Sequence, residues 1–403
     1  MSTKVILAFS GGLDTSYCVK YLQQKKNVEV HAVLVNTGGF DELELNQVEQ
    51  SAKKLGASSF KVLDKVEAYY NKVIRFLIYG NVLKNNTYPL SVSAERTVQA
   101  VAIAQYANQL NADFIAHGST GAGNDQVRFD LVFQTLAPKC EILTPIRDLQ
   151  LSREEEITFL KSNGVEASWE KSKYSINKGL WGTSVGGVET LTSNTPLPEE
   201  AWPSQLTQTE GKQITIEFKK GEPVGINGQN LGAVKTIETL NALGGSYAIG
   251  RDIHIGDTII GIKGRVGFEA AAALMIIKAH HSLEKHTLSK WQLNYKEQLA
   301  SWYGMLLHEA QYLDPVMRNI EAFLTDSQKQ VTGSVKLTLA PYRFTVDGIE
   351  SPNDLMNNDF GAYGEMNNAW SGEDVKGFTK IMANQHRLFN HVRSTDGSIT
   401  KKK

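Results

Sequence analysis

Cysteine is scarce in this chain and long apolar runs are missing. Among 403 residues there are only two cysteines, Cys18 and Cys140, and their surroundings show no metal-ligand spacing. A disulfide framework is therefore excluded, and we interpret both as small buried residues. No run of about 18 apolar residues occurs, so we expect no membrane span, and the apolar run 5–9 is too short for a signal peptide. These shortages predict a cytoplasmic protein.

Excess charge of one sign and proline are also lacking. The 42 lysines and arginines balance 43 acidic residues, for a formal net charge of -1. A nucleic-acid carrier needs bulk positive charge, so we expect no nucleic-acid partner. Glycine, at 34 residues, outnumbers proline, at 10. This excess indicates turns or close approaches of the backbone to a ligand.

The chain is too long for one ordinary core, which favours two domains. Up to about residue 165, short apolar runs alternate with helical patterns, and this alternation predicts βαβ units in a doubly wound parallel sheet of the α/β class. The expected strands are 5–9, 28–35, 59–63 and 113–116. The expected helical segments are 15–24, 41–55, 65–78, 93–110 and one that starts at the capping box of Ser152 and stops at Gly164.

Beyond Ser168 the pattern changes. Residues 172–210 are rich in Ser, Thr, Gly, Asn and Pro and lack clear periodicity. The expected later elements are strands at 213–218, 245–249 and 257–262, helices at 270–288 and 290–307, a hairpin of 335–339 with 342–346, and a helix at 372–389. We therefore predict an ATP-binding domain (1–168), an α+β domain (169–365), and a C-terminal helix with a frayed lysine tail (366–403).

The strongest motif joins the first expected strand to the first expected helix. It reads Ala8-Phe9-Ser10-Gly11-Gly12-Leu13-Asp14-Thr15-Ser16. Free N–H groups at a helix start favour a bound anion, and the two glycines remove Cβ atoms that would block its approach. Asp14 either caps the helix or faces a phosphate-bound Mg²⁺. The motif has no Walker A lysine, so we expect backbone and hydroxyl groups to hold phosphate.

A second polar loop follows the fourth expected strand. It reads His117-Gly118-Ser119-Thr120-Gly121-Ala122-Gly123-Asn124-Asp125-Gln126-Val127-Arg128-Phe129. Ligands of doubly wound sheets bind at the carboxyl ends of the strands, where both loops lie. Asp125 is our candidate for orienting an attacking amine, and the alternative is a helix N-cap without a ligand.

The first motif resembles that of the ATP-pyrophosphatase (PP-loop) superfamily, whose members cleave ATP between the α and β phosphates. The run from Gly121 to Phe129 narrows this likeness, because it resembles the signature of the argininosuccinate synthase family. Further similar segments are Tyr88 with Ser93, then 174–176, 180–184, 350–352 and 361–363. The resemblance covers nearly the whole chain and is strongest in residues 5–185.

The resemblance implies a ligase of arginine biosynthesis that joins citrulline to aspartate and converts ATP to AMP and pyrophosphate. The ureido oxygen of citrulline attacks the α-phosphorus, and the aspartate amine displaces AMP from the resulting citrullyl-adenylate. Because no nucleophilic side chain is required, catalysis rests on positioning and electrostatics. The resemblance also implies Mg²⁺ with ATP and a homotetramer built in part through the C-terminal helix.

The same resemblance assigns roles to individual residues. It places ATP on residues 8–16, Val35 and Gly118; aspartate on Thr120, Asn124 and Asp125; and citrulline on Tyr88, Ser93, Asn124, Arg128, Ser175 and Ser184. Asn124 and Asp125 are the catalytic candidates. Arg128 suits a carboxylate because a guanidinium binds it bidentately.

Two positions depart from the family pattern. Gly256 and Phe268 stand where the family usually has a Glu and a Tyr that bind the amino-acid end of citrulline. One interpretation is that Asp252, Asp257 or Glu269 takes over this contact, or that the alignment slips. The other is that the substrate is an N-acylated citrulline, which has no ammonium group to pair.

Other interpretations carry less weight. A tRNA thiolase of the same superfamily would need cysteines near the nucleotide and a basic surface, and a nucleotide sensor would not need further substrate pockets. His280, His281 and His286, with Glu284, do not share one helix face, so we expect a solvated surface there rather than a metal site.

Overall fold

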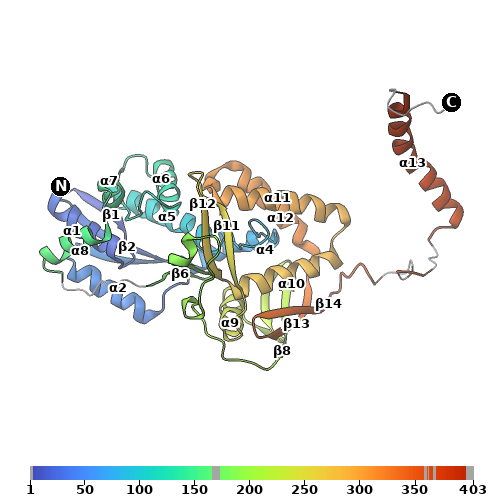
Figure 1. The fold of residues 1–403 in the computed structure, drawn as a ribbon, viewed down its shortest axis with the longest axis horizontal. Coiled ribbons are helices and arrows are strands. Elements are labelled where there is room, and N and C mark those ends of the chain that lie inside the picture. The colour runs from blue at the N-terminus through green and yellow to red at the C-terminus, as the bar shows by residue number, and fades with distance from the viewer. Residues whose placement is uncertain (1–2, 166–172, 358–360, 362, 366–368, 396–403) are drawn as a thin grey trace. The chain divides into compact units, whose positions relative to one another are not determined.

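The computed structural model describes residues 3–165, 173–357, 361, 363–365 and 369–395 (Figure 1). The chain forms two compact units, Met1–Asn353 and Asp354–Lys403. The expected lysine tail, 401–403, lies outside the described residues.

The first half of the larger unit contains a five-stranded sheet in the order β3-β2-β1-β4-β5, with every neighbouring pair parallel. Its strands are β1 (Lys4–Ala8), β2 (Glu29–Asn36), β3 (Ser59–Asp64), β4 (Phe114–Ala116) and β5 (Glu141–Leu143). Its helices are α1 (Leu13–Lys26), α2 (Glu42–Lys54), α3 (Val66–Tyr69), η1 (Tyr70–Ile74), α4 (Arg75–Tyr79), α5 (Ser91–Gln109), α6 (Asp125–Leu136), α7 (Pro145–Leu149) and α8 (Arg153–Ser162).

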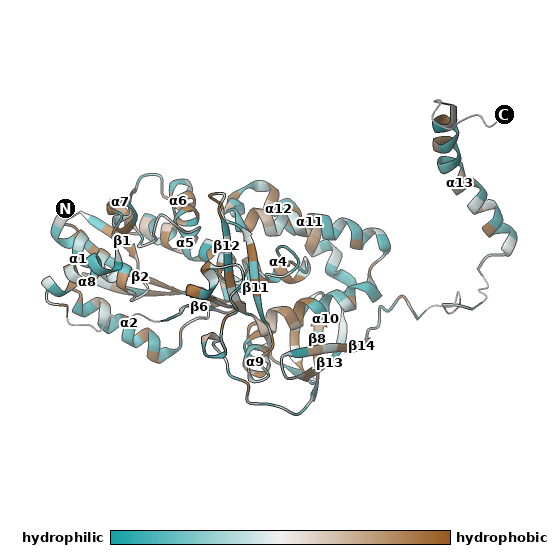
Figure 2. Ribbon diagram, viewed as in Figure 1, coloured by the Kyte–Doolittle hydropathy of each residue, from teal (hydrophilic) through white to brown (hydrophobic). Residues whose placement is uncertain are grey.

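Helices cover both faces of this sheet, as its apolar strands require. Alternate residues of β1 face opposite cores: Leu7 packs with α1 and α8, whereas Ile6 packs with α5 and α6. A parallel sheet covered on both faces reads as continuous apolar runs. Figure 2 shows such brown stretches on the strands and more polar residues on α2. The predicted doubly wound α/β domain is thus confirmed.

The second half of the larger unit contains two antiparallel sheets, ordered β11-β12-β7-β6 and β10-β9-β8-β13-β14. Its strands are β6 (Ser175–Gly179), β7 (Gly182–Gly186), β8 (Lys212–Lys219), β9 (Glu222–Ile226), β10 (Gln229–Asn230), β11 (Arg251–Asp257), β12 (Lys263–Glu269), β13 (Gly333–Ala340) and β14 (Arg343–Glu350). Its helices are α9 (Ala233–Ser246), α10 (Ala271–Thr287), α11 (Lys290–His308) and α12 (Pro315–Ser327), with 3-10 turns η2 (Val188–Leu191), η3 (Glu199–Ala201), η4 (Gln311–Leu313) and η5 (Gln328–Gln330).

Two expected strands are wrong. Residues 245–249 contain the end of α9 and the turn after it, because α9 buries an apolar face with Ile237 and Leu240 in the core. The expected strand 257–262 falls between two real strands, because Asp257 ends β11 and residues 258–262 form the turn to β12. The segment 172–210 contains the β6–β7 hairpin, which its glycine-rich composition did not predict.

Among its described residues, the smaller unit has one helix, α13 (Gly372–Thr395), as expected. It exposes several apolar side chains, among them Phe378, Ile381, Met382, Leu388 and Phe389. Across the described part of the chain, no helix has both the length and the apolar content needed to span a bilayer.

Candidate active site

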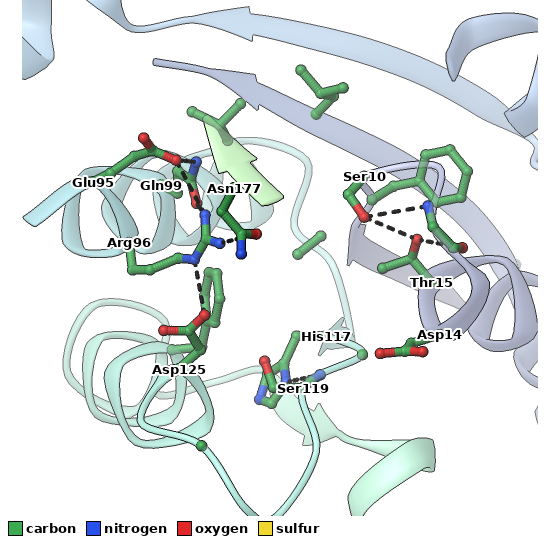
Figure 3. A pocket seen from close by; sticks show the side chains of 18 of the residues that line it. Ser10, Asp14, Thr15, Glu95, Arg96, Gln99, His117, Ser119, Asp125 and Asn177 are labelled. Carbon is green, nitrogen blue, oxygen red and sulfur yellow. Dashed lines mark hydrogen bonds and ion pairs between the residues drawn. The ribbon is translucent and has the colours of Figure 1, made fainter. Parts of the chain in front are cut away.

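A cavity of about 970 Å³ opens at the carboxyl ends of β1, β2 and β4, where the sequence predicted a ligand site (Figure 3). The predicted site residues that line it are Ala8, Phe9, Ser10, Gly12, Leu13, Asp14, Thr15, Val35, Gly118, Thr120, Asn124, Asp125, Arg128 and Ser175. Those that lie outside its lining are Gly11, Ser16, Tyr88, Ser93 and Ser184. Residues from both predicted loops therefore meet around one space.

The first loop leaves the start of α1 open toward the cavity. Gly12 is the N-cap residue, and no side chain caps the helix. The interpretation of Asp14 as the cap is therefore wrong. Gly11 has a φ of +79°, a left-handed conformation that glycine adopts readily. Ser16 is buried and its hydroxyl donates to the Gly12 carbonyl at 2.8 Å, so this serine shapes the loop from behind.

Asp14 faces a second carboxyl group that the sequence did not suggest. Glu156 of α8 is 3% exposed and hydrogen-bonds to Asp14. Burial, together with the nearby Asp14 charge, raises the pKa of Glu156 to about 8. Burial also raises the pKa of Asp14. Among the described residues, no group of three His, Cys, Asp or Glu side chains could hold a metal ion. The Asp14 carboxyl on the cavity wall still suits a cation that arrives with phosphate.

The second loop packs directly against the first. A Cβ on Gly118 would lie 3.3 Å from atoms of Asp14 and Thr15, so glycine permits this close approach. At the far end of the loop, the side-chain amide oxygen Oδ1 of Asn124 accepts a hydrogen bond from Ile259 N at 2.8 Å. Asn124 thus joins the cavity to the turn between β11 and β12.

Asp125 is held between two arginines. Arg96 Nε lies 2.9 Å from one of its carboxylate oxygens, and Arg128 Nη1 lies 3.0 Å from the other. Burial would raise the pKa of Asp125, but the two guanidinium groups outweigh it and lower that pKa. Asp125 is the first residue of α6, and Asn124 occupies the N-cap position without a capping hydrogen bond. The alternative of Asp125 as a simple N-cap is therefore wrong.

Arg96 is the main site residue that the sequence analysis missed. It contacts Asp125 of α6, Gln99 at 3.0 Å on its own helix, and Asn177 of β6 at 3.1 Å (Figure 3). These partners come from three separate segments, so no local motif marks the arginine. Its position three residues after Ser93 on α5, about one helical turn, was the signal that the sequence offered.

Glu95, the neighbour of Arg96, is an acid buried against the β6–β7 hairpin. It is 2% exposed, and one carboxylate oxygen accepts from Gln99 at 2.7 Å. A Cβ on Gly179 would lie 1.8 Å from its other oxygen, so the glycine leaves room for the carboxyl group. Burial raises the pKa of Glu95 to about 7, even though Arg96 opposes the shift.

Three of the predicted citrulline residues lie beside the cavity rather than in its lining. The Tyr88 hydroxyl accepts from Val92 N at 3.2 Å. Ser93 donates to the carbonyl of Leu90. Ser184 stands opposite Phe268 in the β7–β12 pair.

The two unusual positions, 256 and 268, belong to this same region. Phe268 is fully buried and its ring lies 5.3 Å from that of Tyr88, which stacks on His254 at 4.9 Å. A Cβ on Gly256 would lie 2.6 Å from His254 Nε2. The His254 side chain therefore fills space beside Gly256 that a larger residue at that position would need.

Two of the acids proposed to replace the missing carboxylate already have cationic partners. Glu269 accepts from Arg251 Nε at 3.1 Å, and Asp257 pairs with Lys263 at 2.7 Å. Asp252 accepts from the backbone of Ile253.

Comparisons with known proteins agree with this geometry. The family model described as "Arginosuccinate synthase N-terminal HUP domain" matches residues 4–166, and the model described as "Arginosuccinate synthase C-terminal domain" matches residues 174–389. The chain is 38% identical to a protein from Dictyoglomus turgidum over 389 residues, which cover 96% of this chain and 97% of the relative. It is 38% identical to one from Methanocaldococcus jannaschii over 368 residues, covering 91% and 93%.

A further relative, from Xanthomonas campestris, is 35% identical over 405 residues, covering 97% of this chain and all of the relative. All three relatives carry the name argininosuccinate synthase. Both halves of the chain match the same family, and the relatives align over nearly their whole length. The chain therefore belongs to the argininosuccinate synthase family.

Proposed function

We propose that the protein joins citrulline to aspartate at the expense of ATP, with citrullyl-adenylate as the intermediate and AMP and pyrophosphate as by-products. The observation that carries this proposal is the meeting of two loops at one cavity. The glycine-rich loop at the start of α1 suits a triphosphate. The loop before α6 supplies the polar groups that a second and third substrate need. Family membership points to the same reaction.

ATP would lie across the ends of β1, β2 and β4. The open N–H groups of α1 and the hydroxyls of Ser10 and Thr15 would hold the departing pyrophosphate. Val35 and Gly118 would border the adenosine. Mg²⁺ bound with ATP would offset the pyrophosphate charge, and Asp14 would be the residue that holds it.

Asp125 would accept a hydrogen bond from the amine of aspartate and orient it for attack. Its lowered pKa keeps it ionised, which suits an acceptor better than a group that must carry a proton. Thr120 and Asn124 would contact the rest of aspartate, and Asn124 also reaches citrulline. Catalysis then depends on orientation and on fixed charges rather than on a nucleophilic side chain.

Citrulline would lie between α6 and the β6–β7 hairpin. Arg128 and Ser175 line the cavity on these two sides. Tyr88, Ser93 and Ser184 would complete the citrulline pocket. The family names of the relatives favour citrulline itself over an N-acylated form.

The proposal also includes the domain organisation, the oligomeric state and the cellular location. We infer an ATP-binding domain at 1–168, a synthetase domain at 169–365, and a C-terminal segment from 366 that takes part in a homotetramer. The exposed apolar side chains of α13 support a role in assembly. We also infer a cytoplasmic enzyme without a nucleic-acid or membrane partner.

Pyrophosphate release tests the reaction. We expect release only when ATP, citrulline and aspartate are all present, and argininosuccinate should appear in equal amount. A matched series with N-acetyl- and N-succinyl-citrulline should give a lower kcat/KM than citrulline. Pyrophosphate release that does not require aspartate, or a clear preference for an acylated substrate, would overturn the assignment.

A further inference from the structure

Hydrogen bonds with buried side chains hold both ends of the loop between β4 and α6. At its start, Ser119 N donates to His117 Nδ1 at 3.2 Å. At its end, the Gln126 amide donates to the carbonyl of Gly121 at 2.6 Å and to that of Gly123 at 3.2 Å. These contacts matter because the three glycines of the loop, at 118, 121 and 123, leave its backbone little stiffness of its own.

The hydrogen bonds of His117 fix its tautomer. A backbone N–H can only donate, so Nδ1 must be the unprotonated acceptor. The proton therefore sits on Nε2, which lies 2.9 Å from Asp130 Oδ1. The ring is 1% exposed and stacks on Phe129 with centroids 5.5 Å apart. Asp130 thus holds the ring in the one orientation that accepts from Ser119.

Arg147 connects the two ends of the loop. Its Nη1 lies 2.7 Å from Asp130 Oδ2 and 3.4 Å from Gln126 Oε1. Burial would raise the pKa of Asp130, but the hydrogen bonds from His117 and Arg147 lower it. Asp130 is therefore a carboxylate that accepts from both sides. One cation on α7 supports the histidine at the start of the loop and the glutamine at its end.

We propose that His117, Asp130 and Arg147 form a positioning triad that sets the backbone of residues 118–124 in the shape that receives substrate. The part that concerns ATP and aspartate rests on the function proposed above. These residues do not perform the chemistry. They fix where Gly118 meets Asp14 and where Asn124 and Asp125 begin α6. Ordering a flexible segment in advance lowers the entropic cost of binding and of reaching the transition state.

The first test uses Asp130→Asn with Asp148→Asn as the matched control. Both aspartates contact Arg147, since Asp148 Oδ1 lies 3.4 Å from its Nε, but only Asp130 reaches the histidine. Amide hydrogen exchange of the full chain is measured without substrates. We expect exchange in residues 118–124 to be about tenfold faster in Asp130→Asn. Exchange in β1 and α1 should not change, and Asp148→Asn should match the wild type.

The second readout is kinetic. Asp130→Asn should raise KM for ATP and for aspartate by about tenfold, with a much smaller change in KM for citrulline, whose proposed contacts other than Asn124 lie outside residues 118–124. If this variant does not fold, His117→Asn serves instead. Its amide oxygen takes the place of Nδ1 but cannot reach Asp130, so the loop should again exchange faster.

The two proposals fail in different ways. Unchanged exchange in residues 118–124 of both variants would overturn the triad, even if ligation proceeds normally. A wild type that releases no pyrophosphate with citrulline and aspartate would overturn the ligase, while the exchange experiment would still decide the triad.

Discussion

Two clusters of charged side chains in this protein differ in their exposure to the cavity. In the first, Arg96, Asp125 and Arg128 lie beside the cavity, and Asp125 keeps 36% of its side chain exposed. In the second, Lys296 of α11 pairs with Glu284 of α10 at 2.6 Å, and both are fully buried. The first cluster leaves charge facing a space that substrates can enter, whereas the second encloses its charge completely.

The enclosed cluster satisfies each charge with protein groups. Lys296 Nζ also donates to the Tyr79 carbonyl at 2.9 Å, and Glu284 accepts from Asn81 at 2.6 Å and from Gln328 at 2.8 Å. Because protein groups occupy these positions, the network does not offer its charges to a ligand. Burial and ion pairing alone therefore do not mark a functional site, and a charge must also face open space.

We expect the largest effect from a substitution that disrupts the enclosed cluster. Lys296→Met leaves Glu284 charged and buried without its cation, which should lower the free energy of unfolding by about 3–5 kcal/mol. Urea unfolding measures this change. Lys235→Met, which removes an exposed ion pair with Glu238, should alter stability by about 0.5 kcal/mol or less. Equal effects of the two variants would contradict the distinction between enclosed and exposed charge.

We expect the next largest effect from a substitution in the first cluster, which faces the cavity. Asp125→Asn should lower kcat by about 10²- to 10³-fold, because the neutral amide no longer orients the attacking amine between two arginines. Stability should change far less than in Lys296→Met. Steady-state pyrophosphate release gives the rate, and Asp326→Asn on the surface of α12 is the control. Wild-type kcat in Asp125→Asn would show that this carboxylate is structural, like Glu284.

A smaller effect tests the arginine that the sequence did not reveal. Arg96→Lys keeps the charge but loses the planar group that reaches Asp125, Gln99 and Asn177 together. We expect kcat/KM for citrulline to fall by about tenfold while the unfolding midpoint stays close to that of the wild type. If lysine restores full activity, charge alone explains the role of Arg96.

The smallest effect concerns Glu95 and pH. Its folded-state pKa, about 7, lies above the ordinary value near 4.5, so the folded protein keeps a proton that the unfolded chain has lost. Between these values the folded state binds more protons, and stability should fall as pH rises from 4.5 to about 7.

Glu95→Gln cannot ionise, so most of this fall should be absent in that variant. Urea unfolding at pH 5 and pH 7.5 compares the two proteins. An identical pH dependence in both would mean that Glu95 is already ionised at pH 5.

The fold was predictable where a signal is local. The apolar runs of β1 and β2, the capping box at Ser152 and the glycine pair after β1 all lie within a few residues, and the structure has the corresponding elements. The segment 245–249 was misread because a short apolar run fits a strand or a helix equally well until its packing is known.

The site shows the same division. The two loops were predictable because their residues are consecutive and because parallel strands end at one sheet edge. Arg96 and Glu95 were not, since Arg96 binds Asp125 of α6 and Asn177 of β6, and Glu95 packs against Gly179 of β6. His280 and Glu284 were expected on a solvated surface, and that prediction is wrong: α10 is buried on nearly all sides, so polar residues on it meet other helices.

The sequence by itself determined the parallel sheet, the glycine-rich start of α1 and the polar loop before α6. Each depends on short-range geometry and on the order of residues along the chain. Only the tertiary structure decided which buried charges face the cavity and which are enclosed. That choice depends on side chains brought together from distant segments, and the free energy of a charge is set by all of its neighbours at once.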